Sequence, residues 1–197
     1  MKERVLTAPV GYDAVAQPMV ASFAAQLDDQ LRRLKKEVEG LSVVQLEWQP
    51  YAGMNTIGML LAHLAVVDLF WINVATKEIA IEPDGDNFIL SVLGIRMDDD
   101  GLPLKPDDLH PLSLKGRPIE NYLEMLDAAR ATVHAELHTW RDTELQVSYM
   151  RGETRITREW TVYHVLEHFA SHFGQILLLK HMMRDRGILE RPKEAKE

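Results

Sequence analysis

The 197-residue chain contains no cysteine. This absence excludes disulfide bonds, zinc sites with thiolate ligands and a protein thiol as nucleophile. A basic stripe is also missing: 30 acidic residues against 22 lysines and arginines give a formal net charge of −8, which argues against nucleic acid as a ligand. If the chemistry of this protein involves sulfur, the sulfur must therefore come from a small molecule.

Long uninterrupted apolar runs are absent as well. The longest, residues 58–67, is broken by His63 and closed by Asp68, so we expect it to be too short and too polar to span a membrane. Residues 1–4 are not followed by the apolar segment of a secretory signal. We therefore expect a cytoplasmic protein that does not associate with membranes.

The residues that are present describe an ordinary globular domain, with 46% apolar and 26% charged side chains. The length suits one domain, residues 1–197, with a substantial core. Helical periodicity of apolar residues predicts four helices, over residues 18–40, 55–79, 118–140 and 157–187.

Local signals support the ends of these helices. Pro18 suits a first turn and Gly40 suits a helix end, while Asn55 and Thr157 can cap the second and fourth helices. The second predicted helix is apolar nearly all round, so we expect it to be deeply buried.

Two further segments complete the predicted architecture. Residues 82–116, with four prolines, form a long crossover with a short helical piece near residues 88–93. Residues 147–156 have the β-type residues of a small hairpin around Gly152. We therefore predict an all-α four-helix bundle, with the crossover between helices two and three and the hairpin before helix four.

The acidic run at residues 98–100 lies in the crossover. We expect a solvated loop, because a calcium-binding EF-hand frame would place Arg96 where a carboxylate is needed.

The eight histidines include three pairs spaced four residues apart: His134/His138, His164/His168 and His168/His172. On a helix, each pair lies one turn apart on one face, within reach of one metal ion. His164 and His172 are about 12 Å apart along the helix axis, too far to share an ion with Zn–N bonds of about 2.0–2.1 Å.

A helical wheel at about 100° per residue separates these pairs. His172 falls inside the apolar arc of the fourth predicted helix, His168 at its rim and His164 beyond it. His134 and His138 fall at the edge of the apolar face of the third helix or beyond it, so we expect flank or solvent-facing residues rather than metal ligands. The pair that points into the bundle is His168/His172.

His63 lies at the centre of the apolar face of the second helix. A lone histidine in such a place is more often a hydrogen-bonded core residue than a ligand, but an imidazole buried without a partner is costly. His168 and His172 on a facing helix would supply partners. Three neutral imidazoles bound to one metal ion would leave coordination positions free for water or substrate, as in catalytic metal sites. From the sequence, His63 is therefore either a hydrogen-bonded core residue or a metal ligand.

A competing motif overlaps this region. Residues 164–168 match the H-x-x-E-H string of inverzincin proteases. That family supplies a further carboxylate ligand from a later element, but only 29 residues follow His168 and most of them complete the same helix. We therefore do not expect a protease of this class.

Three strings together resemble the DinB-like superfamily, also called the DinB/YfiT-like metalloenzymes. They are WQP at residues 48–50, NTIGMLLAHL at 55–64 and HVLEHFASHFGQI at 164–176, and the resemblance covers roughly residues 15–187. It implies a four-helix bundle, often a homodimer, with a divalent metal ion, commonly zinc or nickel. Carried over residue by residue, the metal ligands are His63, His168 and His172.

The resemblance also implies a small-molecule substrate and a function. Characterised relatives include thiol-dependent enzymes that use mycothiol, bacillithiol or glutathione, such as maleylpyruvate isomerases and thiol S-transferases. The chain departs from near relatives at Ser171, where another histidine is common, and at Phe173, where arginine is common. Loss of that arginine weakens the case for an acidic thiol.

We therefore expect a metal-dependent enzyme, a thiol-dependent S-transferase in the first instance. Glu167 and Asp68 are candidate catalytic bases, although Asp68 lies about 140° from His63 on the wheel. The alternatives are a metal-dependent hydrolase, which needs the same ligands, and a non-catalytic, stress-related metal-binding bundle.

Overall fold

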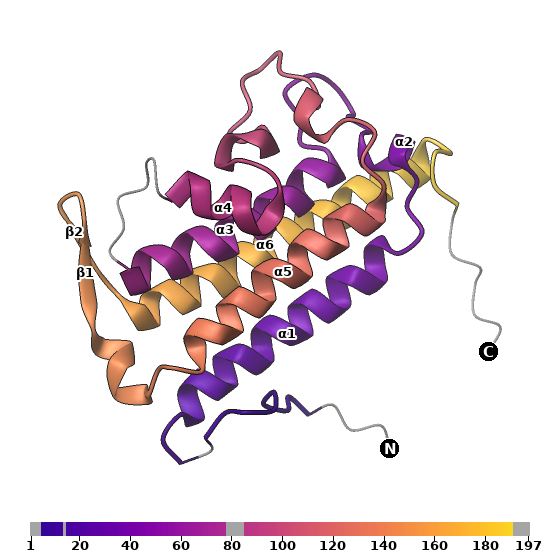
Figure 1. Cartoon of the computed structure of the whole chain (residues 1–197). Coiled ribbons are helices and arrows are strands. Elements are labelled where there is room, and N and C mark those ends of the chain that lie inside the picture. The colour runs from indigo at the N-terminus through magenta and orange to yellow at the C-terminus, as the bar shows by residue number, and fades with distance from the viewer. Residues whose placement is uncertain (1–4, 14, 78–84, 191–197) are drawn as a thin grey trace.

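The computed structural model describes residues 5–13, 15–77 and 85–190 (Figure 1). The described chain is mostly helical, with a small two-stranded sheet. Its α-helices are α1 (Pro18–Val38), α2 (Val43–Leu46), α3 (Ile57–Lys77), α4 (Asp86–Leu93), α5 (Ile119–Leu137) and α6 (Arg158–Asp185). Its 3-10 helices and strands are η2 (Met97–Asp100), η3 (Leu112–Leu114), η4 (Asp142–Gln146), β1 (Ser148–Arg151) and β2 (Thr154–Thr157).

The long helices α1, α3, α5 and α6 lie side by side, and α3 runs in the same direction as α5 (Figure 1). The connection between α3 and α5 carries α4, η2 and η3. Helices α1, α5 and α6 fall inside the predicted ranges, and α4 matches the predicted helical piece. The predicted end of the second helix, at residue 79, lies outside the described residues. Helix α2 and the 3-10 helices have no counterpart among the predicted elements, since segments of three to five residues carry no periodicity.

The start of α3 differs from the prediction. Thr56, not Asn55, caps this helix, because its Oγ1 accepts a hydrogen bond of 3.1 Å from the backbone N–H of Met59. Asn55 instead donates through Nδ2 to Oε1 of Gln175 on α6, at 3.2 Å. Thr56 thus stabilises the first turn of α3, and Asn55 links the start of this helix to α6.

Helix α3 is the buried centre of the fold. Residues Ile57–Thr76 have a mean hydropathy of 1.9, and by length and composition alone they are long and apolar enough to cross a membrane. The expectation that this segment is too short and too polar was therefore wrong. However, 83% of the segment is buried inside the protein, mainly against α5 and α6, as in the core helix of a soluble domain.

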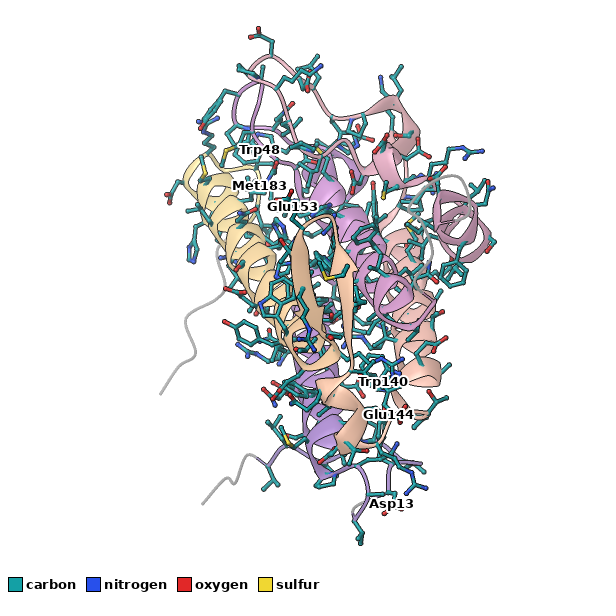
Figure 2. All side chains as sticks on the ribbon, turned by 90° about the vertical axis from the view of Figure 1, so that its left-hand side faces the viewer. Asp13, Trp48, Trp140, Glu144, Glu153 and Met183 are labelled. Carbon is teal, nitrogen blue, oxygen red and sulfur yellow. The ribbon has the colours of Figure 1, made fainter. Side chains whose placement is uncertain are left out.

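The predicted hairpin is confirmed as β1 and β2, which pair antiparallel with Tyr149 opposite Ile156. Gly152 turns the chain with a φ of +57°, a conformation that side chains with a Cβ rarely adopt. Both Tyr149 and Ile156 are buried, and the Tyr149 hydroxyl lies 2.7 Å from Oγ1 of Thr161 in α6. Figure 2 shows the hairpin from its own side of the molecule, with Glu153 at the turn.

The acidic run folds as η2, and its last residue is not solvated. Asp100 is only 2% exposed, so the expectation of a solvated loop was wrong at this position. Gly101 follows with a φ of +77°, and a Cβ there would lie 3.0 Å from Pro111 and 3.1 Å from Met59. This tight turn allows the chain to leave η2 while the Asp100 side chain stays inside.

Candidate metal centre

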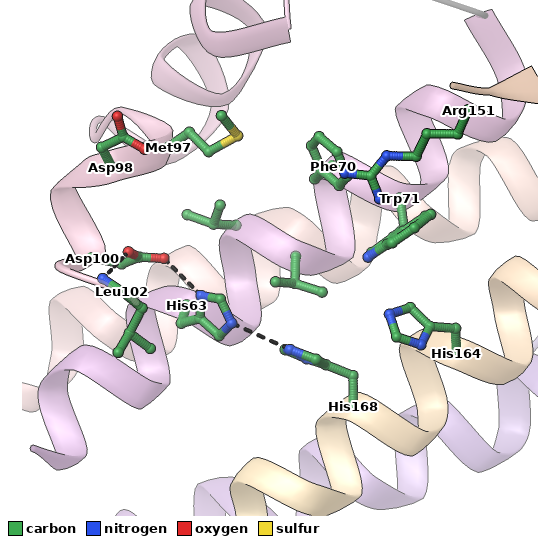
Figure 3. A pocket seen from close by; sticks show the side chains of 12 residues that line it. His63, Phe70, Trp71, Met97, Asp98, Asp100, Leu102, Arg151, His164 and His168 are labelled. Atoms are coloured by element: carbon green, nitrogen blue, oxygen red, sulfur yellow. Dashed lines mark hydrogen bonds and ion pairs between the residues drawn. The ribbon is translucent and has the colours of Figure 1, made fainter. Parts of the chain in front are cut away.

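Three partly buried histidines from two helices converge. His63 of α3 faces His168 and His172 of α6, and each of the three offers a ring nitrogen within 4.8 Å of the others. Nε2 of His168 lies 3.2 Å from Nε2 of His63 and 3.1 Å from Nε2 of His172. Figure 3 shows the contact between His63 and His168.

The ring of His63 is oriented by Asp100. Nδ1 of His63 lies 2.8 Å from Oδ2 of Asp100, and the other carboxylate oxygen accepts a 2.8 Å bond from the backbone N–H of Leu102. A carboxylate only accepts hydrogen bonds, so the His63 proton is on Nδ1. With its proton on Nδ1, the ring can present a lone pair at Nε2, toward His168.

His172 is oriented in the same way by an amide. Its Nδ1 lies 3.0 Å from Oε1 of Gln175, and this oxygen also accepts the bond from Asn55. Since the amide oxygen accepts, the proton of neutral His172 is on Nδ1, and its Nε2 also presents a lone pair toward His168.

His168 cannot satisfy both neighbours. One N–H at its Nε2 can donate to one lone pair only, and its Nδ1 is buried with no hydrogen-bond partner among the described residues. Burial, reinforced by the neighbouring His172 and His63, lowers the pKa of His168 to about 3, so the ring is neutral at pH 7. Burial also lowers the pKa of His172. The cluster has more lone pairs than hydrogens, which is an arrangement that a cation would satisfy.

The donor set fits a divalent metal ion. Tetrahedral zinc with Zn–N bonds of about 2.0–2.1 Å places its ligand atoms about 3.3 Å apart. The two Nε2–Nε2 distances of 3.2 and 3.1 Å are close to this value. Imidazole nitrogens suit zinc and nickel, and three ligands leave a position open for a small molecule.

A cavity of about 350 Å³ adjoins two of these histidines, His63 and His168 (Figure 3). One wall is apolar and comes from α3, with Val66, Val67, Phe70 and Trp71. Its polar lining includes Asp98 of η2, Arg151 of β1 and His164 of α6. The candidate metal centre is therefore open to a pocket of the size that holds a small organic molecule.

His164 lines this pocket without joining the three-histidine group. Its ring stacks on Trp160 with centroids 4.7 Å apart and an interplanar angle of 8°, and meets Trp71 edge-on at 4.8 Å. Burial lowers the pKa of His164, so it too is neutral at pH 7. The remaining member of the H-x-x-E-H string, Glu167, has a side chain that is 54% exposed.

The two candidate bases lie elsewhere. Asp68 is 2% exposed, and its Oδ2 accepts a 2.9 Å bond from Arg130 of α5. Burial raises the pKa of Asp68, although the Arg130 guanidinium opposes the shift. The Glu167 carboxylate lies 3.9 Å from Nδ1 of His164. Neither carboxylate belongs to the described residues that line the pocket.

Of the pair His134/His138 at the C-terminal end of α5, His134 has both ring nitrogens hydrogen-bonded. Nδ1 of His134 lies 2.8 Å from the hydroxyl of Tyr12, and its Nε2 lies 2.8 Å from Oδ1 of Asp28. The His138 ring packs on Tyr12 with centroids 4.2 Å apart. Of the two predicted positions, flank or solvent-facing, His134 has the flank position, since residues from the N-terminal segment and α1 partly cover it.

Sequence reasoning missed Asp100, Gln175 and Arg151, which the structure brings to the site or the pocket. Gln175 lies three residues after His172, a spacing that places it one helical turn away. Asp100 and Arg151 carry no such signal, because each reaches the site from a separate element. Phe173, where near relatives often have arginine, is buried in the core.

Comparison with known proteins is consistent with this arrangement. A sequence model of the DinB superfamily matches residues 26–176, a range that contains His63, His168 and His172. No curated protein matches the chain.

Two solved structures resemble the fold. The conserved protein of a locus from Enterococcus faecalis is similar with a TM-score of 0.61 and 14% sequence identity, covering 82% of this chain and 94% of that one. A DinB-like protein from Bacillus cereus has a TM-score of 0.49 and 16% identity, covering 87% of this chain and 95% of that one. At 14% identity, the first likeness shows a shared fold and no more.

Proposed function

Because the chain belongs to the DinB superfamily, we propose that it is a metal-dependent enzyme in which His63, His168 and His172 bind one divalent ion, zinc or nickel. The observation that carries the proposal is the convergence on His168 of two lone pairs, held in place by Asp100 and Gln175. In this proposal the long helices act as a four-helix bundle that holds α3 and α6 in register.

The reaction that we propose is thiol-dependent S-transfer to a small electrophilic molecule. A divalent ion bound here would supply a Lewis acid that lowers the pKa of a coordinated thiol. The chain has no cysteine, so the thiol must be a separate low-molecular-weight molecule. The apolar wall of the pocket, with Phe70 and Trp71, would hold the electrophile and limit access of water.

The side chains around the histidines have supporting roles in this scheme. Asp100 keeps the proton of His63 on Nδ1 and fixes the plane of its ring, and Gln175 does the same for His172. Both leave Nε2 free as a ligand atom. The same ligands would also serve hydrolysis, so a requirement for thiol separates the two reactions.

The test combines metal analysis with turnover. Protein purified without added metal is analysed for its elements, stripped with a chelator, and titrated with zinc and with nickel. Loss of an electrophile, such as a chlorodinitrobenzene, is then followed with mycothiol, bacillithiol or glutathione, with and without metal.

We expect about one ion per chain and turnover that needs both metal and thiol. Turnover that needs metal and not thiol would favour the hydrolase and overturn S-transfer. Absence of metal uptake would overturn both the S-transferase and the hydrolase, and would favour a non-catalytic bundle.

A further inference from the structure

Arg151, the last residue of strand β1, places a positively charged side chain at the pocket. The guanidinium carbon of Arg151 lies 4.6 Å from the ring centroid of Trp71 and 5.1 Å from that of Phe70 (Figure 3). Of the described residues that line the pocket, Arg151 is the one with a permanent positive charge. The hairpin thus adds to the pocket a group that neither α3 nor α6 provides.

The geometry of the hairpin explains why the exposed Arg151 lies over α3 at the pocket. Side chains two residues apart on a strand share a face, so Arg151 lies on the same face as Tyr149. Tyr149 is buried and tied by its hydroxyl to Thr161 in α6. Met150, on the opposite face, is 62% exposed. The anchor at Tyr149 therefore turns Arg151 toward α3 and the pocket.

Arg151 has no carboxylate partner in the part of the chain that the structure describes, in contrast to several other arginines of the chain. Arg96, Arg130 and Arg158 each lie within 4.0 Å of a carboxylate oxygen. Among the described residues, no carboxylate lies within that distance of Arg151. A guanidinium that lies over aromatic rings keeps its edge N–H donors available, and their planar fork matches a carboxylate.

The remaining charges in the pocket give the anion one preferred place. Asp98 lies at the other end of the pocket from Arg151 (Figure 3), where it would repel a carboxylate. Asp100 is engaged with His63 and Leu102. An anionic group therefore finds its attractive partner at the hairpin end of the pocket, which the apolar residues of α3 and His63 and His168 also line.

We propose that Arg151 binds the carboxylate of the small-molecule substrate, and that Trp71 and Phe70 hold the apolar body of the same molecule. The substrate class is thus an organic acid with an apolar or aromatic body. The inference rests on the proposed function in one respect, namely that this pocket is the place where the substrate reacts. The binding site itself requires only the described side chains.

The experiment compares two probes of nearly equal shape, 3-phenylpropionate and its neutral amide. Binding to the full chain is followed by tryptophan fluorescence and by ligand-observed NMR, first in metal-free protein, so that the carboxylate cannot bind a metal ion, and then in metal-loaded protein. We expect the acid to bind at least about tenfold more tightly than the amide, since a hydrogen bond to a charged group contributes that much or more. The preference should fall as salt is added.

Arg155 provides the matched control. It lies on β2 of the same hairpin, and its Nε donates to Oγ of Ser148 at 2.8 Å. R151Q should reduce the preference for the acid to within about threefold, R155Q should leave it unchanged, and R151K should keep part of it. R151K retains the charge, so it also reports on the site if R151Q folds poorly.

Equal binding of acid and amide to the wild-type chain, or a preference that survives in R151Q or disappears equally in R155Q, would overturn the inference. Its failure can be told from failure of the proposed function. If the protein takes up no metal but still binds the acid more tightly than the amide, the metal-dependent function is wrong and the anion site is supported. Thiol-dependent turnover without any preference removes the anion site alone.

Discussion

Two histidine pairs with the same spacing have opposite surroundings in this protein. On α6, His168 and His172 meet His63 across the helix interface, and Nε2 lone pairs converge. On α5, His134 has the same i,i+4 neighbour in His138, but both of its ring nitrogens are already bonded within the protein.

The contrast depends on one atom of each ring. His63 and His134 each face a carboxylate through one nitrogen, Asp100 and Asp28 respectively. The other nitrogen of His134 meets the hydroxyl of Tyr12, which can donate a hydrogen, whereas that of His63 meets another imidazole. Spacing places histidines on one face, but the group opposite the second nitrogen decides whether a lone pair is left for a metal.

The largest expected difference between the pairs is in metal uptake. H168A removes the nitrogen that both neighbours approach, so we expect zinc uptake to fall from about one ion per chain to less than about a tenth. H134A removes an imidazole from an equally spaced pair and should leave uptake unchanged. Elemental analysis of both variants after dialysis against zinc measures this. Equal losses in the two variants would contradict the distinction between the pairs.

The carboxylate beside His63 should have the next largest effect. In D100N, the oxygen can still accept from Leu102, but the amide N–H₂ then faces Nδ1 of His63 and favours the tautomer with the proton on Nε2. We expect about ten- to a hundredfold weaker zinc binding by calorimetry. D98N removes the same charge from the pocket without touching a histidine, and a comparable loss there would indicate a general electrostatic effect.

The pH dependence of stability offers a third comparison. The folded pKa of His168, about 3, lies below its unfolded value of about 6.5, so between these values the unfolded state binds more protons. Metal-free protein should therefore lose stability as the pH falls from about 6.5, by up to about 1.4 kcal/mol per pH unit from this residue, with no change from it above that pH.

Urea unfolding at pH 7 and pH 5 measures this slope. H168Q removes the titrating group, so the variant should show a shallower slope than the wild type. An unchanged slope in H168Q would show that other groups account for the acid sensitivity.

The smallest effect concerns His134, whose two ring nitrogens are both hydrogen-bonded. Y12F removes the hydroxyl that faces Nδ1 of His134, and we expect the free energy of unfolding to fall by about 1 kcal/mol, because a partly buried acceptor loses its partner. Zinc uptake should stay at the wild-type level. An increase in uptake would instead mean that a freed nitrogen is enough to create a site on α5.

Much of the fold followed from local patterns. The helices α1, α5 and α6, the short α4 and the hairpin are each specified by periodicity, caps and a glycine turn, which act within a few residues. The cap of α3 was misplaced by one residue, since Asn55 and Thr56 have similar capping ability and only contact with Gln175 separates them. The acidic run was misjudged at Asp100, because its burial depends on where His63 lies 37 positions earlier.

The candidate site was also predicted in part from the sequence. A wheel and a resemblance singled out His63, His168 and His172, and the structure brings these three together; that they bind metal stays a prediction. Asp68 and Glu167 were chosen for their chemistry and their place along the helices. Burial directs Asp68 to Arg130, on the α5 side, and leaves the Glu167 side chain largely exposed.

The sequence alone was enough to predict the long helices, the three histidines that face one another and the need for an external thiol in any sulfur chemistry, because periodicity and composition are properties of the chain alone. Only the tertiary structure decided which histidine nitrogens have lone pairs to share, that Asp100 fixes one ring, and that Arg151 reaches the pocket. These features depend on contacts of a few ångströms between residues far apart in sequence, and no local pattern encodes such distances.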